Sequence, residues 1–140
     1  MRAMLIDDER LALKQLKRML EEVVGGVEII EMTSNPVQAL ERSEELQPDV
    51  VFLDIHMPGM NGLKLGEKLQ QAVPHVEIVF VTAYDQYAVK AFDICALDYI
   101  LKPVHPIRLQ QTVERVRQKI MLVREIDGLS PIPCPESSQI

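Results

Sequence analysis

Five polar residues come at or just after the end of apolar segments of the chain, and their types could do chemistry together. They are Asp7, Asp8, Asp54, Thr82 and Lys102. If the apolar segments are neighbouring parallel strands, their carboxyl ends lie along one rim of a sheet, where α/β proteins bind ligands. Three carboxylates about 4 Å apart would repel each other by roughly 4 kcal/mol per pair at an effective dielectric constant of 20. The residues therefore predict a site that needs positive charge.

A hard divalent cation would supply part of that charge. Lys102 contributes one positive charge, and Mg²⁺, which prefers oxygen ligands, would contribute two more. A carboxylate beside a lysine and Mg²⁺ suits phosphoryl transfer, because that chemistry depends mostly on positioning and charge neutralisation. Asp54 can then attack phosphorus as a nucleophile and become an acyl phosphate. We predict a Mg²⁺-dependent phosphoryl-acceptor site at Asp54.

Taken one at a time, these residues have ordinary structural explanations. The acidic run Asp7-Asp8-Glu9 could cap the helix that follows it. Asp54 could simply end a strand, Thr82 could be structural, and Lys102 could be solvated. Their convergence on one rim favours the chemical interpretation.

The rest of the chain alternates between segments that suit strands and segments that suit helices. Apolar segments of strand length occur at 2–6, 27–32, 49–54, 76–82 and 97–101. Amphipathic segments with helical spacing lie between and after them, at 10–23, 36–46, 63–72, 86–94 and 106–126. Glycine and proline fall in the joints, as in Gly25-Gly26 and Pro58-Gly59. Five strand–helix repeats with right-handed crossovers predict a doubly wound α/β fold with a five-stranded parallel sheet.

Composition limits the classes of function. The chain has 140 residues, 47% hydrophobic and 26% charged, enough for one domain with a buried core. Its net charge of −6 argues against nucleic-acid binding by this domain through general phosphate attraction. The apolar segments are far shorter than the ~20 residues that a membrane-spanning helix needs. Residues 127–140 contain three prolines and no basic residue, so we predict a domain at 1–126 and a linker or disordered tail at 127–140.

Four short motifs contain the candidate residues: LIDDE at 5–9, LDIHMPGMNG at 53–62, VTA at 81–83 and LKP at 101–103. In order and spacing they resemble the signatures of response-regulator receiver domains of the CheY-like superfamily, over about residues 2–120. The segments TAYDQYAVKAF at 82–92 and ALDYILKP at 96–103 look most like receivers of LytR/AlgR-type regulators. The resemblance implies a (βα)5 flavodoxin-like fold with strand order 2-1-3-4-5. It also implies a cytoplasmic two-component protein that a sensor histidine kinase phosphorylates on Asp54 to control an attached or partner output, transcription above all.

The resemblance also implies roles for individual residues around the cation. Asp8 and Asp54 would bind Mg²⁺ directly, and the backbone carbonyl of His56 would be a third protein ligand. Asp7 would act on the cation through water. Receivers are not enzymes with a separate substrate, but they catalyse their own phosphorylation and dephosphorylation.

Further residues would contact the phosphoryl group or respond to it. The resemblance makes Asp54, Lys102 and Thr82 the catalytic residues, with Lys102, the Thr82 hydroxyl and the Ala83 amide binding the phosphoryl group. Thr82 and Tyr99 would form the conformational switch, and the peptide bond before Pro103 would be cis. Two more positions, His56 and Tyr84, would line the entrance to the site.

The last predicted helix, 106–126, suggests an assembly surface. Its apolar positions step by four and three residues, the rhythm of a helix-pairing seam: Leu109, Val113, Val116, Ile120 and Val123. A helix of that length spans about 31 Å at 1.5 Å per residue, more than one small sheet needs. We therefore expect Met121, Leu122, Val123 and Ile126 to need a partner. The family resemblance implies a homodimer, on phosphorylation, through the last two helices and the last strand.

Two alternatives come from other functional classes. Phosphohydrolases of the haloacid-dehalogenase type also combine Asp, Thr or Ser, and Lys around Mg²⁺. They resemble a pattern with a second acid two residues after the nucleophile, whereas His56 stands two residues after Asp54. The other alternative is a receiver-like docking module that is never phosphorylated, although every residue needed for phosphorylation is present.

Overall fold

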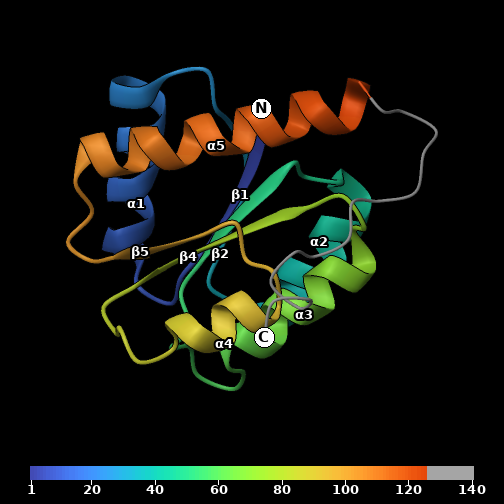
Figure 1. The fold of residues 1–140 in the computed structure, drawn as a ribbon. Coiled ribbons are helices and arrows are strands. Elements are labelled where there is room, and N and C mark those ends of the chain that lie inside the picture. Colours follow the sequence, from blue (N-terminus) through green and yellow to red (C-terminus); the bar gives the residue numbers. More distant parts are fainter. Residues whose placement is uncertain (126–140) are drawn as a thin grey trace.

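The computed structural model describes the backbone of residues 1–125 and the side chains of residues 1–123 (Figure 1). Its strands are β1 (Arg2–Ile6), β2 (Glu28–Thr33), β3 (Val50–Leu53), β4 (Glu77–Thr82) and β5 (Asp98–Leu101). Its helices are α1 (Arg10–Arg18), continued by the π-helix η1 (Met19–Val24), α2 (Pro36–Leu46), α3 (Gly62–Ala72), α4 (Ala88–Asp93) and α5 (Pro106–Glu125). All strand pairs are parallel, in the order β2-β1-β3-β4-β5. The predicted fold class and strand order are confirmed.

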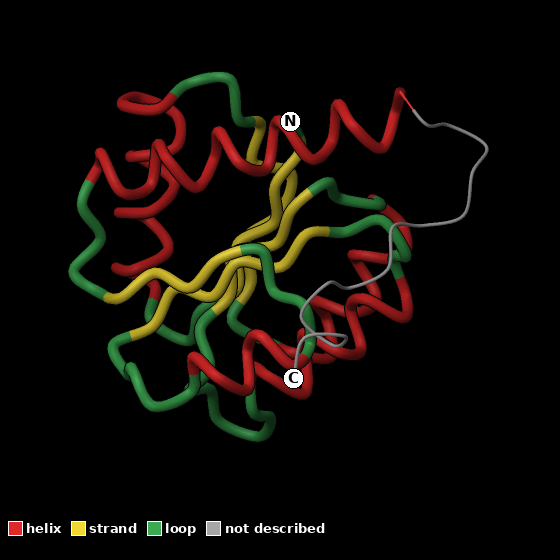
Figure 2. Tube along the Cα trace, in the orientation of Figure 1, coloured by secondary structure: helices red, strands yellow, loops and turns green. Residues whose placement is uncertain are grey.

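Helices cover both faces of the sheet, as Figure 2 shows. Because side chains alternate along a strand, Met4 and Ile6 of β1 face one helical layer while Ala3 and Leu5 face the other. The first core contains residues of α2, α3 and α4, and the second contains residues of α1 and α5. This two-sided burial explains why β3 is buried along its whole length and reads as a continuous apolar run.

Local sequence signals set the helix ends. The Asn35 side chain accepts hydrogen bonds from the amides of Val37 and Gln38, at 2.9 and 3.1 Å, and Pro36 occupies the first turn of α2. The Asn61 side chain caps α3 by accepting from the Leu63 amide at 2.7 Å. The predicted helix at 10–23 is present, but its last part is the π-helix η1, which ends at Gly25 with φ of 75°.

Only part of the long helix α5 packs into the core. Leu109, Val113 and Val116 are fully buried in the layer shared with α1. Ile120 packs at the edge of that layer, whereas Met121 and Leu122 are 60% and 47% exposed. The helix continues to Glu125, and Ile126 and the predicted tail at 127–140 lie outside the described residues. Among the described helices, none has a stretch apolar and long enough to cross a membrane.

A buried carboxylate, Asp98, ties the edge strand β5 to α5. The Arg108 guanidinium donates to both of its oxygens at 2.8 and 2.7 Å, and the Thr112 hydroxyl donates at 2.6 Å. Arg115 adds a contact of 3.3 Å. Burial acts to raise the pKa of Asp98, but the hydrogen bonds from Arg108 and Thr112 outweigh it and hold the pKa below its ordinary value.

Replacing this carboxylate should therefore destabilise the fold in a pH-dependent way. We expect Asp98→Asn to lower the free energy of unfolding by about 1–3 kcal/mol at neutral pH, the usual cost of losing a hydrogen-bonded charge and leaving its partner unpaired. Because the folded pKa is depressed, the stabilisation is present above the unfolded pKa of about 3.9 and is lost as the pH falls through the folded value. Urea unfolding of both proteins across this range measures the difference. An equal loss for the exposed Asp93→Asn would contradict the prediction.

Candidate functional site

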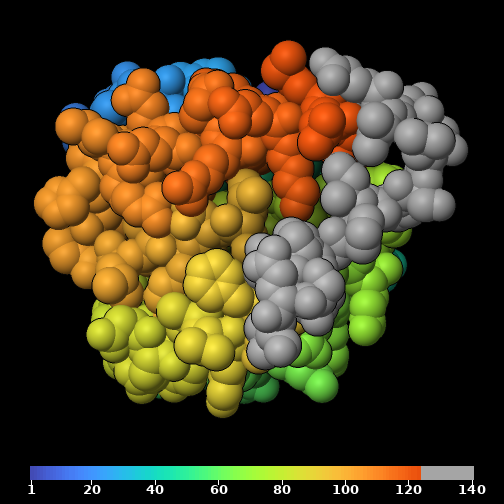
Figure 3. Space-filling model, in the orientation of Figure 1, coloured from blue at the N-terminus to red at the C-terminus, as the bar shows by residue number. Residues whose placement is uncertain are grey.

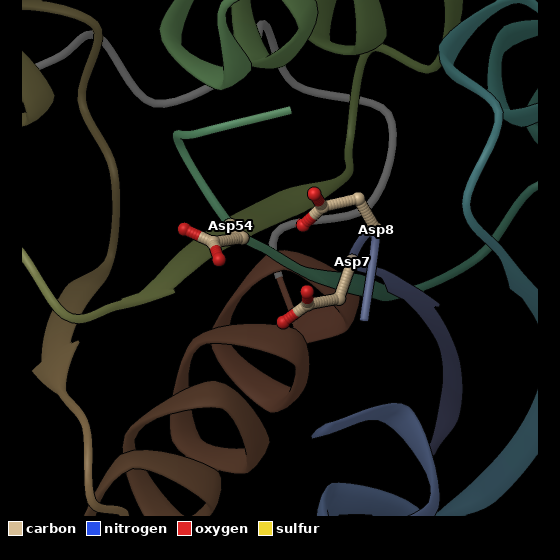
Figure 4. A group of neighbouring side chains, drawn as sticks. All are labelled: Asp7, Asp8 and Asp54. Carbon is tan, nitrogen blue, oxygen red and sulfur yellow. The ribbon is translucent and has the colours of Figure 1, made fainter. Parts of the chain in front are cut away.

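Three carboxylates meet at the carboxyl end of the sheet (Figure 4). Asp7 and Asp8 follow β1, and Asp54 follows the neighbouring strand β3. One oxygen from each lies within 4.8 Å of the others. Asp7 and Asp54 are buried, at 6% and 7% exposure, whereas Asp8 is exposed. The convergence predicted from the chain order is thus present in the fold.

The positive charge in this group comes from Lys102, at the end of β5. Its ammonium donates to Asp7 at 2.8 Å and to Asp54 at 3.1 Å. Burial acts to lower the pKa of Lys102, but the hydrogen bonds to Asp7 and Asp54 together raise it above its ordinary value. Burial raises the pKa of Asp7 and outweighs the opposite effect of Lys102. Because its pKa is raised, Lys102 stays an ammonium at neutral pH.

Backbone amides fix the orientation of two of the carboxylates. The Glu9 amide donates to Asp7 at 2.9 Å, and the His56 amide donates to Asp54 at 3.3 Å. Each of these carboxylates thus uses one oxygen for Lys102 and the other for the backbone. Three carboxylates with one ammonium leave an excess of negative charge and an all-oxygen donor set, which fits a hard divalent cation such as Mg²⁺.

A close approach of backbone to backbone shapes the loop that carries Asp54. The Gly62 amide donates to the Ile55 carbonyl at 2.7 Å. A Cβ atom at Gly62 would lie 2.1 Å from the Asp54 carbonyl oxygen and 2.6 Å from the Ile55 Cα atom. Only glycine fits there without moving the loop. Gly62 was noted in the sequence only as part of a motif, and its steric role depends on folding.

Thr82 is the last residue of β4, the strand next to β3, and Ala83 follows it. The Thr82 side chain is fully buried, and its hydroxyl accepts from the Tyr84 amide at 3.4 Å. Ala83 lines the surface depression over Asp54. The Thr82 carbonyl also accepts from the Lys102 amide at 2.8 Å, which fixes where β5 delivers its lysine. The Lys102–Pro103 peptide bond is cis.

Tyr99, on β5, lies against the loop after β4. Its hydroxyl donates to the Tyr84 carbonyl, and its ring lies 6.3 Å from that of Phe80. Burial is the main cause that raises the pKa of Tyr99, so its hydroxyl remains a donor at neutral pH. The residue expected to respond to Thr82 therefore reaches the segment that follows Thr82.

An aromatic cluster stands at the rim of the depression. His56 and Tyr84, both expected at the entrance, line it together with Asp54 and Lys102. Their ring centroids are 4.1 Å apart. Tyr87 joins them through its hydroxyl, 3.1 Å from His56 Nε2. Tyr87 could not be identified from the sequence, because neither its type nor its spacing indicates a contact with a histidine from another loop.

The chain is similar to known proteins of one family. The model of the response regulator receiver domain family matches residues 3–114. An uncharacterised response regulatory protein of Vibrio parahaemolyticus is 45% identical over 141 residues, covering 94% of this chain and 57% of that protein. The transcriptional regulatory protein LytR of Staphylococcus aureus is 44% identical over 117 residues, covering 84% of this chain and 47% of LytR. The chain thus spans about half the length of these relatives.

Solved structures of response regulator domains have a similar fold. The response regulatory domain of protein mrkE from Klebsiella pneumoniae superposes with a TM-score of 0.80 at 29% identity, covering 87% of this chain and 99% of that one. The receiver domain of AraT from Geobacillus stearothermophilus also gives 0.80, at 28% identity, covering 88% and 97% of the two chains.

Proposed function

Because the chain belongs to the response regulator receiver domain family of two-component systems, we propose that it accepts a phosphoryl group from a sensor histidine kinase on Asp54, with Mg²⁺ as cofactor. The observation that carries this proposal is the contact of Lys102 with both Asp54 and Asp7 beside Asp8. The match to this family argues against the phosphohydrolase alternative.

The reaction follows from the residues around Asp54. An oxygen of Asp54 forms the bond to phosphorus as the bond from phosphorus to the kinase histidine breaks, and the electron pair stays on the histidine nitrogen. Lys102 neutralises charge on the transferred group, and the Thr82 hydroxyl and Ala83 amide hydrogen-bond to it. Asp8, Asp54 and the His56 carbonyl would hold Mg²⁺, with Asp7 acting through water. Bound there, the ion would offset the negative charge that gathers on the phosphoryl oxygens.

The same residues would catalyse hydrolysis of the phosphoryl group on Asp54, which ends the signal. Water attacks phosphorus, the bond from phosphorus to the Asp54 oxygen breaks, and the carboxylate is restored. Receivers of this kind are therefore self-acting catalysts rather than enzymes with a separate substrate.

Phosphorylation would act by changing the surface that the domain presents to a partner. A phosphoryl group that draws the Thr82 hydroxyl toward it would favour one position of Tyr99. The elements α4, β5 and α5 carry exposed apolar side chains: Val89, Phe92, Leu101 and Ile107, 47–73% exposed. In Figure 3 the yellow-to-orange surface of these elements faces the viewer. We propose that this face forms a homodimer on phosphorylation, and that the exposed Met121 and Leu122 extend the contact.

The remaining length of the relatives points to an output outside this chain. LytR is a transcriptional regulatory protein, and this chain matches only 47% of it. We propose that residues 1–126 are the receiver, that 127–140 link it to an output controlling transcription, and that the protein acts in the cytoplasm.

The first test is the site of phosphorylation. Incubation with acetyl phosphate and Mg²⁺ should add one acid-stable, base-labile phosphoryl group, because a small donor needs only the site itself. Intact mass spectrometry should detect it on wild type and on the exposed-surface control Asp93→Asn, but not on Asp54→Asn. Full labelling of Asp54→Asn would refute the assignment, and an unlabelled wild type would favour the docking-module alternative.

The second test is the cation. Asp8→Ala should weaken Mg²⁺ binding by about tenfold or more, because it removes a direct ligand from a site with few protein ligands. Without Mg²⁺ the same variant should be more stable than wild type, since one repulsive carboxylate is gone. Titration calorimetry and thermal unfolding measure the two effects. The exposed-surface variant Asp93→Asn is the control, and equal Mg²⁺ affinity in Asp8→Ala and wild type would count against the site.

The third test is the switch. Thr82→Ala should still be phosphorylated on Asp54 but should lose much of the dimerisation that follows, because the hydroxyl that favours the active arrangement is missing. Thr82→Ser, which keeps the hydroxyl, should behave like wild type. Sedimentation of each protein with and without phosphorylation measures the shift. Dimerisation of Thr82→Ala to the wild-type extent would show that the signal takes another route.

A further inference from the structure

The aromatic cluster at the rim of the site joins two loops, one after β3 and one between β4 and α4. His56 lies in the loop after β3, Tyr84 in the loop after β4, and Tyr87 immediately before α4. The His56 ring is stacked on Tyr84 at 4.1 Å and 31°, and its Nε2 atom lies 3.1 Å from the Tyr87 hydroxyl. Tyr84 and Tyr87 meet edge to face, with centroids 6.5 Å apart. One imidazole is thus held on its face by one tyrosine and at its edge by another.

The two tyrosines are themselves held in place. Tyr87 is partly buried and packs against the core beneath α3 and α4. The Tyr84 carbonyl accepts from the Tyr99 hydroxyl. An exposed histidine side chain would otherwise move between rotamers, and ordering it costs conformational entropy. The hydrogen bond between the imidazole and the hydroxyl of a partly buried tyrosine supplies a restraint that the stack alone lacks, because stacked rings can slide.

The restrained ring borders the space that a phosphoryl group on Asp54 would enter. His56, Tyr84, Asp54 and Lys102 all line the same depression, whereas Tyr87 does not line it. The His56 amide is bonded to Asp54 at 3.3 Å, so the imidazole starts from a backbone fixed to the acceptor. Tyr87 therefore affects the site through its contact with His56.

We infer that Tyr87 is a positioning residue whose hydroxyl holds the His56 imidazole over the mouth of the site and thereby slows hydrolysis of the acyl phosphate on Asp54. Hydrolysis needs a water oxygen in line with phosphorus, opposite the Asp54 oxygen that leaves. Phosphorus gains the bond to water, loses the bond to Asp54, and the water proton passes to solvent. A ring fixed at the mouth limits the water that can reach that line. The inference rests on the proposed phosphorylation of Asp54.

The test removes one hydroxyl. Tyr87→Phe keeps the ring and its packing but loses the contact with Nε2, so the label on Asp54 should disappear about threefold to tenfold faster, as expected for one neutral hydrogen bond. The rate is measured by intact mass after the acetyl phosphate is removed, with Mg²⁺ present. The surface control Asp93→Asn, at the exposed end of α4, should keep the wild-type rate.

A double variant separates positioning from a general loosening of α4. His56→Ala should also speed hydrolysis, and adding Tyr87→Phe to it should change nothing more, because Tyr87 acts through the imidazole. Additive effects of the two changes would overturn the inference. A Tyr87→Phe rate equal to or slower than that of wild type would overturn it as well.

The unphosphorylated protein gives a second readout. The ring-nitrogen NMR signals of His56 should differ between wild type and Tyr87→Phe, since Nε2 loses its partner, and should be unchanged in Asp93→Asn. Identical His56 signals in all three proteins would overturn the contact itself. If wild type accepts no label, the proposed function fails and this inference fails with it. If wild type is labelled and Tyr87→Phe keeps its label equally long, this inference alone fails.

Discussion

The concentration of negative charge at the end of the parallel sheet is the constraint on which the rest of the structure depends. One carboxylate oxygen from each of Asp7, Asp8 and Asp54 lies within 4.8 Å of the others, because β1 and β3 are neighbours and end at the same rim. Such a group is stable only with positive charge among it. Lys102 reaches Asp7 and Asp54 from β5, past the end of β4. The order of the strands and the charges at their ends are therefore parts of one arrangement.

Much of that arrangement could be predicted from the sequence, because it depends on local signals and on chain order. Apolar periodicity and turn residues located each strand and helix to within a few residues, and a parallel sheet then placed Asp7, Asp54 and Lys102 on one rim. Asn35 and Asn61 mark the starts of α2 and α3 for local reasons as well, since each caps the helix that follows it.

What the sequence could not predict depends on contacts between distant segments. Asp98 looks like an ordinary polar residue of a strand until Arg108 and Thr112 are brought over it by α5. The contact of Tyr87 with His56 joins residues 31 positions apart through two loops whose shapes the sequence does not specify. The π-helical continuation of α1 also depends on packing, because Leu20 of η1 is fully buried in the layer shared with α5. In each case a tertiary contact selects one of several local options.

The contact between Lys102 and Asp54 also connects the site to the face formed by α4, β5 and α5. Lys102 is bonded directly to Asp54 and belongs to the same short segment as Tyr99 and Asp98, which contact the β4–α4 loop and α5. Phosphorylation exchanges a carboxylate for a group carrying up to about two negative charges. If Asp54 is the acceptor as proposed, the electrostatic force on Lys102 would then change, and β5, which Lys102 follows, would transmit that change. A ligand can shift such an equilibrium only as far as it binds one arrangement better than the other. In the proposed switch, the available energy would therefore be limited by the difference in how well Lys102 and Thr82 contact the phosphoryl group in the two arrangements. Residues that do not contact the group, such as Tyr99 and Asp98, would then determine only which part of the surface changes.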